Sequence, residues 1–258
     1  MQPVNLAASE VVVGPGVRFS AGGALARSLA VWRRNLPFLL LVAVLAQLPG
    51  FLASSFLPRG DGFFSLGTRV ETLLDNILGF VASGLVTVSV LDQLRGLPRD
   101  NRRSISIGAS RLGPLIGVSI GTGIATGVLF LLFIVPGLIA LVRWVLVGPI
   151  AVLEPGVDTW ARSTELTKGH RWALAGILVV LYLGLSVVAV AFGFGGEALI
   201  GEPGPSLSPG KSLLLNAITS VPGPLFLSFQ SVLDVVLYEQ LRAEKEGADV
   251  GQLTAVFE

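Results

Sequence analysis

The sequence is poor in the residue types on which most enzymes and metal proteins depend. It has no cysteine and only one histidine, His170, in 258 residues. The lack of cysteine excludes disulfides, thiolate zinc sites and thiol catalysis, and one histidine argues against a histidine metal cluster. The sequence also has no nucleophile elbow, zincin motif or Walker A loop. We therefore expect no enzymatic activity, no cofactor and no metal site.

Charge is also scarce. Only 14% of the residues are charged and 52% are hydrophobic, whereas an ordinary soluble domain has ~25% charged residues. The mean hydropathy is +0.76, and several uncharged runs approach or exceed the ~20 residues that span a bilayer. The composition predicts an all-α, polytopic membrane protein.

The N-terminal segment lacks the features of a signal peptide. "MQPVNLAASEVVVGPGVRFS" has no basic region, and the first long apolar run begins only at Leu36. We expect the first span to be kept. The predicted organisation is a flexible tail over 1–16, a transmembrane domain over 17–245 and a cytoplasmic tail over 246–258.

Uncharged runs divide the transmembrane domain into six candidate spans. Proline and glycine mark two breaks, at Pro136-Gly137 and at Pro222-Gly-Pro224, because proline disfavours helix in the residue before it. An alternative treats the segment after the first break as re-entrant. The predicted spans are 36–57, 72–94, 112–134, 137–153, 173–200 and 212–238.

The distribution of lysine and arginine favours six spans with both termini inside. This threading places fourteen of the 18 basic residues inside and three outside, and it leaves Arg143 within a span. Five spans would place ten inside and seven outside. Because cytoplasmic loops carry an excess of Lys and Arg, six spans are the better prediction.

Three similar basic segments suggest that the chain contains three repeated units. "RSLAVWRRNLPFL", "RSISIGASRLGPLI" and "RSTELTKGHRWAL" each precede a span, which predicts an interfacial helix followed by a helical hairpin. The alternative is that basic segments beside membranes simply look alike. In the first segment Leu25, Leu29, Trp32 and Leu36 share a helical stripe that suits the acyl boundary.

The basic and aromatic residues of these segments are candidates for binding anionic lipid headgroups. Ordinary positive-inside loops without lipid chemistry are an equally good explanation. We expect membrane lipids, rather than nucleic acid, as partners. The candidate headgroup residues are Arg27, Trp32, Arg33, Arg34, Arg102, Arg103, Arg162, Lys168, Arg171 and Trp172.

The third span carries small residues at a spacing of four. Such rows let helix backbones approach closely in lipid, and we expect this one to pack against a neighbour in the same chain rather than in a partner. The glycines concerned are Gly113, Gly117, Gly121, Gly123 and Gly127.

Arg143 is the one basic residue inside a predicted span, and it needs a partner because a charge in the bilayer centre is costly. At 1.5 Å per residue it lies roughly 16 Å from Glu154, while Asp234 lies roughly 12 Å from Arg242. Similar depths predict an Arg143–Asp234 ion pair, with Asn216 and Gln230 as secondary partners. The pair could act as a structural clamp, a ligand site or a proton path.

Three stretches carry a resemblance to a known family. "FIVPGLIALVRWVLVGPIAVLE", "ARSTELTKGHRW" and "VLYEQLRAEKEG" resemble the bacterial glycerophosphoryl diester phosphodiesterase membrane domain and its stand-alone relatives. The likeness runs from about Arg18 to Phe257 and is most specific over 128–172 and the tail. Relatives tend to have an acidic residue directly before the Leu-Arg of the tail, where this chain has Gln240.

The resemblance implies a multi-span helical fold in a bacterial inner membrane, with the pair Arg143-Trp144 inside it. In some family members a separate soluble barrel carries the hydrolase activity, and no part of this sequence could supply that barrel. We therefore expect a membrane scaffold or lipid-interacting module. The alternatives are a small transporter that uses Arg143 and Asp234 and, less well supported, a lipid-processing enzyme.

Overall fold

The structure is a computed structural model that describes residues 18–56, 66–94, 110, 112–201 and 207–256. Within these ranges the regular structure is entirely α-helical, as predicted. The helices are α1 (Ala21–Arg34), α2 (Leu36–Phe56), α3 (Leu66–Leu94), α5 (Leu112–Leu132), α6 (Ile134–Arg143), α7 (Val147–Leu153), α8 (Thr159–Leu166), α9 (Arg171–Ile200), α10 (Pro209–Ser220) and α11 (Pro222–Val256).

Six helical stretches are long and apolar enough to cross a bilayer, which confirms the predicted number. Their lipid-facing surfaces are apolar, because leucine, valine and isoleucine side chains stay exposed along α2, α5 and α9. The chain is therefore a multi-pass membrane protein. The stretches are Leu36–Phe56, Thr72–Leu94, Gly113–Leu132, Ile134–Leu153, Arg171–Ile200 and Pro209–Gly247.

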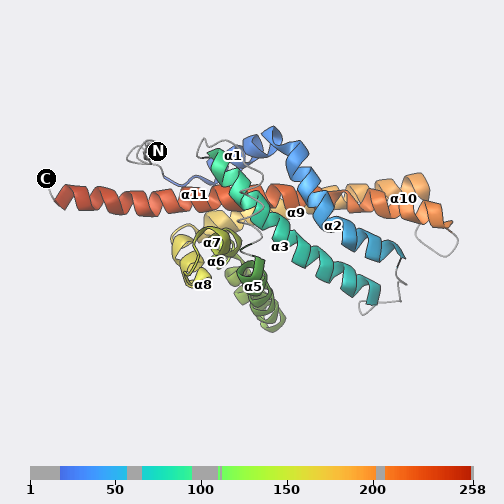
Figure 1. Cartoon of the computed structure of the whole chain (residues 1–258), viewed down its shortest axis with the longest axis horizontal. Helices are drawn as coiled ribbons and strands as arrows, with labels where there is room; N and C mark the ends of the chain where they lie inside the picture. Colours follow the sequence, from blue (N-terminus) through green and yellow to red (C-terminus); the bar gives the residue numbers. More distant parts are fainter. Residues whose placement is uncertain (1–17, 57–65, 95–109, 111, 202–206, 257–258) are drawn as a thin grey trace, which may run out of the picture.

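Helix α11 lies along the long axis of the molecule (Figure 1) and packs against helices on two of its faces. One of its faces packs against α6, α7, α8 and α9 through Leu233, Leu237 and Leu241. The neighbouring face packs against α2 and α3 through Val232 and Val236. A third cluster joins α3, α5 and α7. The longest helix is thus also the centre of the core.

Helices α2 and α3 form an antiparallel hairpin. The Asn35 side chain donates to Gln93 Oε1 (2.6 Å) at one end, and Gly50 lies against the Asp75 carboxyl group further along. At the far end of α2, Asn216 of α10 donates to Ser55 Oγ (2.7 Å). One hydrogen bond therefore closes the hairpin where α2 begins and α3 ends, and another ties the far end of α2 to α10.

Proline positions account for the observed helix breaks. The chain turns at Phe133 and places Pro136 in the first turn of α6, where a missing N–H costs little. Pro222 begins α11 after a turn at Val221. A further break over 144–146, which we did not predict, follows from Pro149, which cannot donate to the Val145 carbonyl and crowds it.

The predicted repeat has counterparts in two of its three copies. Helices α1 and α8 each precede a long helix, as expected for the first and third units. The basic part of the second unit, including Arg102 and Arg103, lies outside the described residues, and so does the predicted tail over 1–16. At the other end α11 continues to Val256, past the predicted domain limit at 245.

The predicted packing of the glycine row is wrong. Within the described part of the chain, nothing lies within 4 Å of a Cβ built on Gly113, Gly117, Gly123 or Gly127, and only Gly121 has a close neighbour, Trp160 at 3.0 Å. The buried side of α5 carries Leu115 and Ser119 instead. Leu115 and Ser119 are also four residues apart, so this spacing alone does not decide which face of α5 is buried. The face that removes more apolar surface from its surroundings is favoured.

The hairpin of α5 and α6 requires glycine at position 137, because there is no room for a side chain there. A Cβ at this position would overlap the ring of Phe130. We expect Gly137→Ala to lower the free energy of unfolding in mixed micelles by about 1–3 kcal/mol, the usual cost of overpacking. Gly127→Ala, which adds a Cβ in open space, should leave stability unchanged or raise it. Equal losses in the two variants would contradict the close approach.

Candidate functional site

The Glu154 carboxylate joins three helices at one end of the bundle. It follows α7, accepts a hydrogen bond from Tyr238 Oη of α11 (2.7 Å) and receives Arg162 Nε of α8 (3.0 Å). The side chains of Arg162 and Glu154 are only 20% and 13% exposed. Charge-assisted bonds are stronger in such a shielded place than at an open surface.

Two more residues of α11 close these contacts into a ring. Arg162 also pairs with Glu246, and Glu246 accepts from Arg242 Nε (2.6 Å). Arg242 Nη1 then donates to Tyr238 Oη (3.0 Å), which returns to Glu154. We call the five residues Glu154, Arg162, Tyr238, Arg242 and Glu246 the polar ring.

Local sequence explains how the polar ring forms. Tyr238, Arg242 and Glu246 repeat every four residues and so share one face of α11. Pro155 and Gly156, the latter with φ +84°, turn the chain back after α7. Asp158 then caps α8 by accepting from the backbone N–H of Trp160 and Ala161 at 3.1 and 3.2 Å.

The electrostatics of the ring favour a fixed charge state. Burial lowers the pKa of Arg162, but the hydrogen bonds and charges of Glu154 and Glu246 outweigh burial and raise the pKa above its ordinary value. Arg162 therefore stays positively charged. With two arginines and two glutamates the ring is balanced, which suits a structural clasp. Arg162, predicted as a headgroup residue, is instead engaged within the protein.

Helix α8 and its C-cap residue also donate hydrogen bonds to a backbone carbonyl at the end of α6. Ser163 Oγ and Thr167 Oγ1 donate to the Arg143 carbonyl, at 2.8 and 3.5 Å. This carbonyl belongs to the last turn of α6 and has no partner within that helix. The polar ring and this helix end are consequently fixed by the same short helix.

The predicted ion pair between Arg143 and Asp234 is wrong. Asp234 Oδ1 accepts from Gln230 Nε2 on its own helix (2.8 Å), and among the described residues Arg143 Nε has no hydrogen-bond partner. The depth estimate assumed one continuous helix from Arg143 to Glu154, and the turn over 144–146 breaks it. The secondary partner Asn216 binds Ser54 and Ser55 instead.

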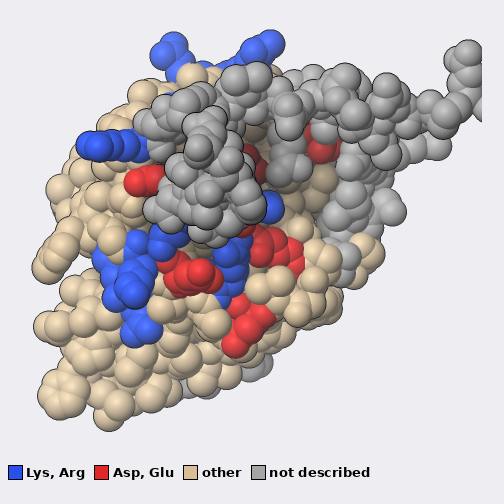
Figure 2. Space-filling model, turned by 90° about the vertical axis from the view of Figure 1, so that its left-hand side faces the viewer, with Lys and Arg blue, Asp and Glu red and all other residues tan. Residues whose placement is uncertain are grey.

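The charged residues gather at the end that carries the polar ring, which we call the charged end (Figure 2). Here Phe19 N donates to Glu244 Oε2 (2.8 Å), so the start of α1 lies beside the last part of α11. Arg27, Arg33, Arg34 and Lys168 are exposed, and Trp172 is 92% exposed. These candidate headgroup residues are therefore accessible.

Helix α1 lies on α11 through a face that we did not predict. Ala24 and Ser28 are both 0% exposed, whereas Leu29 of the predicted stripe remains exposed. Trp32 donates from Nε1 to Ser228 Oγ (2.9 Å). Leu25, Leu29 and Trp32 form one wall of a groove of about 540 Å³, which α9 and α11 complete. The stripe thus keeps its open apolar surface.

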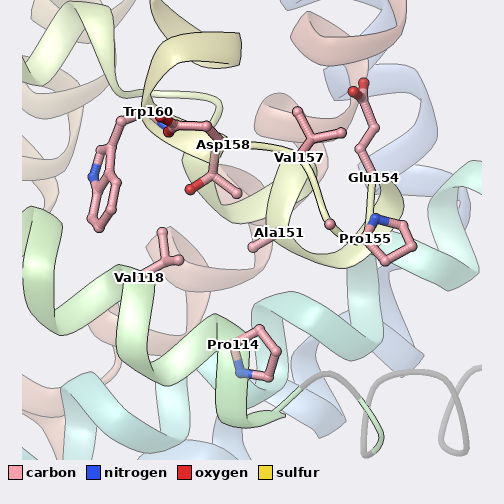
Figure 3. A pocket seen from close by; sticks show the side chains of 10 residues that line it. Pro114, Val118, Ala151, Glu154, Pro155, Val157, Asp158 and Trp160 are labelled. Carbon is pink, nitrogen blue, oxygen red and sulfur yellow. The ribbon is translucent and has the colours of Figure 1, made fainter.

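A smaller pocket of about 300 Å³ lies beside the polar ring, between the start of α5, α7 and the loop before α8. Figure 3 shows the Glu154 side chain turned away from Pro114 and Val118 on the opposite wall. The described residues contain no group of three His, Cys, Asp or Glu side chains that could hold a metal ion. We find no chemical role for this pocket.

Comparison with known proteins gives no match: no family model, no curated protein and no solved structure is similar to this chain.

The polar ring was not predicted, although part of its signal is in the sequence. Tyr238, Arg242 and Glu246 recur at a spacing of four at the end of the last apolar run, a spacing that places side chains together on a helix. Their partners Glu154 and Arg162 come from 84 residues earlier. Sequence spacing contains no information about that contact.

Loss of one arginine should open the polar ring. We expect Arg162→Met to lower the free energy of unfolding by about 2 kcal/mol, because it leaves the shielded Glu154 carboxylate without its cation, whereas Glu246 keeps Arg242. Arg27→Met is the matched control, since Arg27 is exposed, and should change stability by less than about 0.5 kcal/mol. Unfolding titrations in mixed micelles measure both, and equal effects would show that the ring contributes nothing.

Proposed function

We propose that this protein is a lipid-interacting module of a bacterial inner membrane, with both termini and the charged end in the cytoplasm. The excess of Lys and Arg in the segments assigned to that side supports the orientation. The resemblance to the glycerophosphoryl diester phosphodiesterase membrane domain supports the choice of membrane. A barrel-type hydrolase activity is not part of the proposal.

The observation that carries the proposal is the groove between α1, α9 and α11. Its walls are apolar: Leu25 and Leu29 come from α1, Val180 and Val188 from α9, and Phe229 from α11. The one polar atom of its tryptophan, Trp32 Nε1, is already bound to Ser228. A volume of about 540 Å³ lies in the range of ligand sites in proteins.

An acyl chain is the ligand that suits such a groove. It offers no polar group and needs none, and the groove would give it a fixed protein wall in place of mobile lipid. Arg33 follows Leu29 by four residues, so it lies one turn further along the same side of α1. Its charge is available to the headgroup end of the same lipid.

Two glycines of α9 allow a direct test of the groove. Gly184 lines it and Gly176 does not, and a Cβ at either position meets nothing within 4 Å among the described residues. We expect Gly184→Trp to fill the groove and remove most of the phospholipid that the gently extracted protein retains in native mass spectrometry. Gly176→Trp should retain lipid as the parent does. Equal retention by all three proteins would contradict the proposed function.

The orientation can be tested with single cysteines, because the chain has none of its own. Ser208 and Ala161 are both exposed and lie near opposite ends of the bundle. We expect a membrane-impermeant maleimide to label Ser208→Cys in intact spheroplasts and Ala161→Cys only after permeabilisation. The reverse pattern would invert the proposed threading.

A further inference from the structure

A further cavity, of about 380 Å³, lies among α2, α3 and the break between α10 and α11, and we call it the break cavity. Val44, Leu48 and Val221 line it and are exposed on the apolar surface, so it is open toward the lipid. A mainly apolar cavity with a few converging polar groups is the usual form of a ligand site. Among the described residues that line the break cavity, the polar ones are Gln47, Asp75 and Ser220, and none is basic.

Two glycines make room for the polar side chains of the break cavity. A Cβ built on Gly50 would overlap the Asp75 carboxyl group, and one built on Gly223 would overlap the Gln47 amide. Gln47 and Gly50 are three residues apart and so share one side of α2. The Asp75 carboxylate and the Gln47 side chain therefore lie on the same side of α2, about one helical turn apart.

Asp75 places a carboxylate within a membrane span. It belongs to the stretch Thr72–Leu94, and an ionisable side chain in a span is costly and usually marks a functional site. Within the described part of the chain the Gln47 side chain makes no hydrogen bond, so its amide can still bind a ligand. The wall of the break cavity thus offers a carboxylate and an amide in an otherwise apolar setting.

The break between α10 and α11 also favours a positive ligand. Helix α10 ends at Ser220, and the last carbonyls of a helix carry partial negative charge. Pro224 has no N–H to offer the Ser220 carbonyl, which precedes it by four residues. Pro222 lacks an N–H as well, so two of the first three residues of α11 cannot offset the negative end of α10.

We propose that the break cavity binds an organic cation, whose ammonium group pairs with Asp75 and whose apolar part lies against α2 and α10. An ammonium group donates to carboxylate and carbonyl oxygens alike. A metal cation would need a full shell of oxygen ligands, which mainly apolar walls do not provide. The site is separate from the proposed acyl-chain groove, because only Leu225 lines both.

A pair of probes that differ only in charge tests the proposal. Isothermal titration calorimetry of the full chain in a non-ionic detergent at neutral pH compares phenylbutylamine with phenylbutanol, which has the same apolar part and a hydroxyl in place of the ammonium group. We expect the amine to bind at least about tenfold more tightly. Equal affinities for the two probes would overturn the proposal.

A charge variant decides whether Asp75 is responsible. Asp75→Asn keeps the shape of the side chain and its capacity for hydrogen bonds, so a role in helix packing alone would survive it. We expect this variant to bind the amine no more tightly than the alcohol. The control, Asp92→Asn, changes the same helix outside the break cavity and should keep the preference. A preference that persists in Asp75→Asn, or an equal loss in both variants, would contradict the site.

A filling variant tests the cavity without changing its charge. Ala217 lines the break cavity, and we expect Ala217→Trp to abolish binding of the amine. Leu214→Trp, at an exposed position of α10 that does not line the cavity, should bind it as the parent does. Gly184→Trp should also bind the amine, so failure of this proposal and failure of the acyl-chain groove are distinguishable. Parent-like binding in Ala217→Trp would place the amine elsewhere and overturn the proposal.

The ammonium group can come from a free amine or from a lipid headgroup. Dioctanoyl phosphatidylethanolamine and dioctanoyl phosphatidylglycerol share their chains and their phosphate, and only the first carries an ammonium group. Tighter binding of phosphatidylethanolamine that is lost in Asp75→Asn would assign the break cavity to a lipid headgroup. Equal binding of the two lipids, together with the preference for phenylbutylamine, would assign it to free amines.

Discussion

The Glu154 carboxylate is the point on which the charged end depends. It binds Tyr238 of the central helix and Arg162 of a short surface helix, so one side chain fixes α7, α8 and α11 together. The position of α8 in turn fixes Ser163 and Thr167 against the open end of α6. A shielded carboxylate is favourable only with all its partners present, which makes this end a single unit.

The membrane-embedded part is organised differently. Far from the polar ring the helices meet through small contacts, such as Asn216 with Ser55 and Gly50 with Asp75. Much of the surface of α5 and α9 is apolar and exposed, as expected of helices whose neighbours are lipid. A firmly held charged end and an open apolar part suit the lipid-interacting module that we propose.

The sequence was a good guide to the spans and a poor guide to their contacts. Long uncharged runs located all six spans because lipid demands about 20 apolar residues for each. The prolines located the breaks at Phe133 and Val221, but the break before Pro149 was missed. The uncharged sequence on both sides of Arg143 predicts one continuous helix, which places Arg143 at the depth of Asp234, whereas the chain turns over 144–146.

Contacts between helices depend on which faces meet, and spacing alone does not decide this. Gly117 and Ser119 both belong to rows of small or medium residues in α5, yet only Ser119 is buried. For the same reason, sequence spacing does not predict the polar ring. Its three residues on α11 share a face by spacing, whereas Glu154 and Arg162 reach them only through the folded arrangement of α7 and α8.

A double-mutant cycle between Arg162→Met and Tyr238→Phe tests the central role of Glu154 most directly. Each variant removes one donor to the same carboxylate. Unfolding free energies in mixed micelles should give a coupling of about 1 kcal/mol or more, because the network loses its cooperativity with the first change. Effects that add to within about 0.3–0.5 kcal/mol would show that the two contacts are independent and that no ring holds this end together.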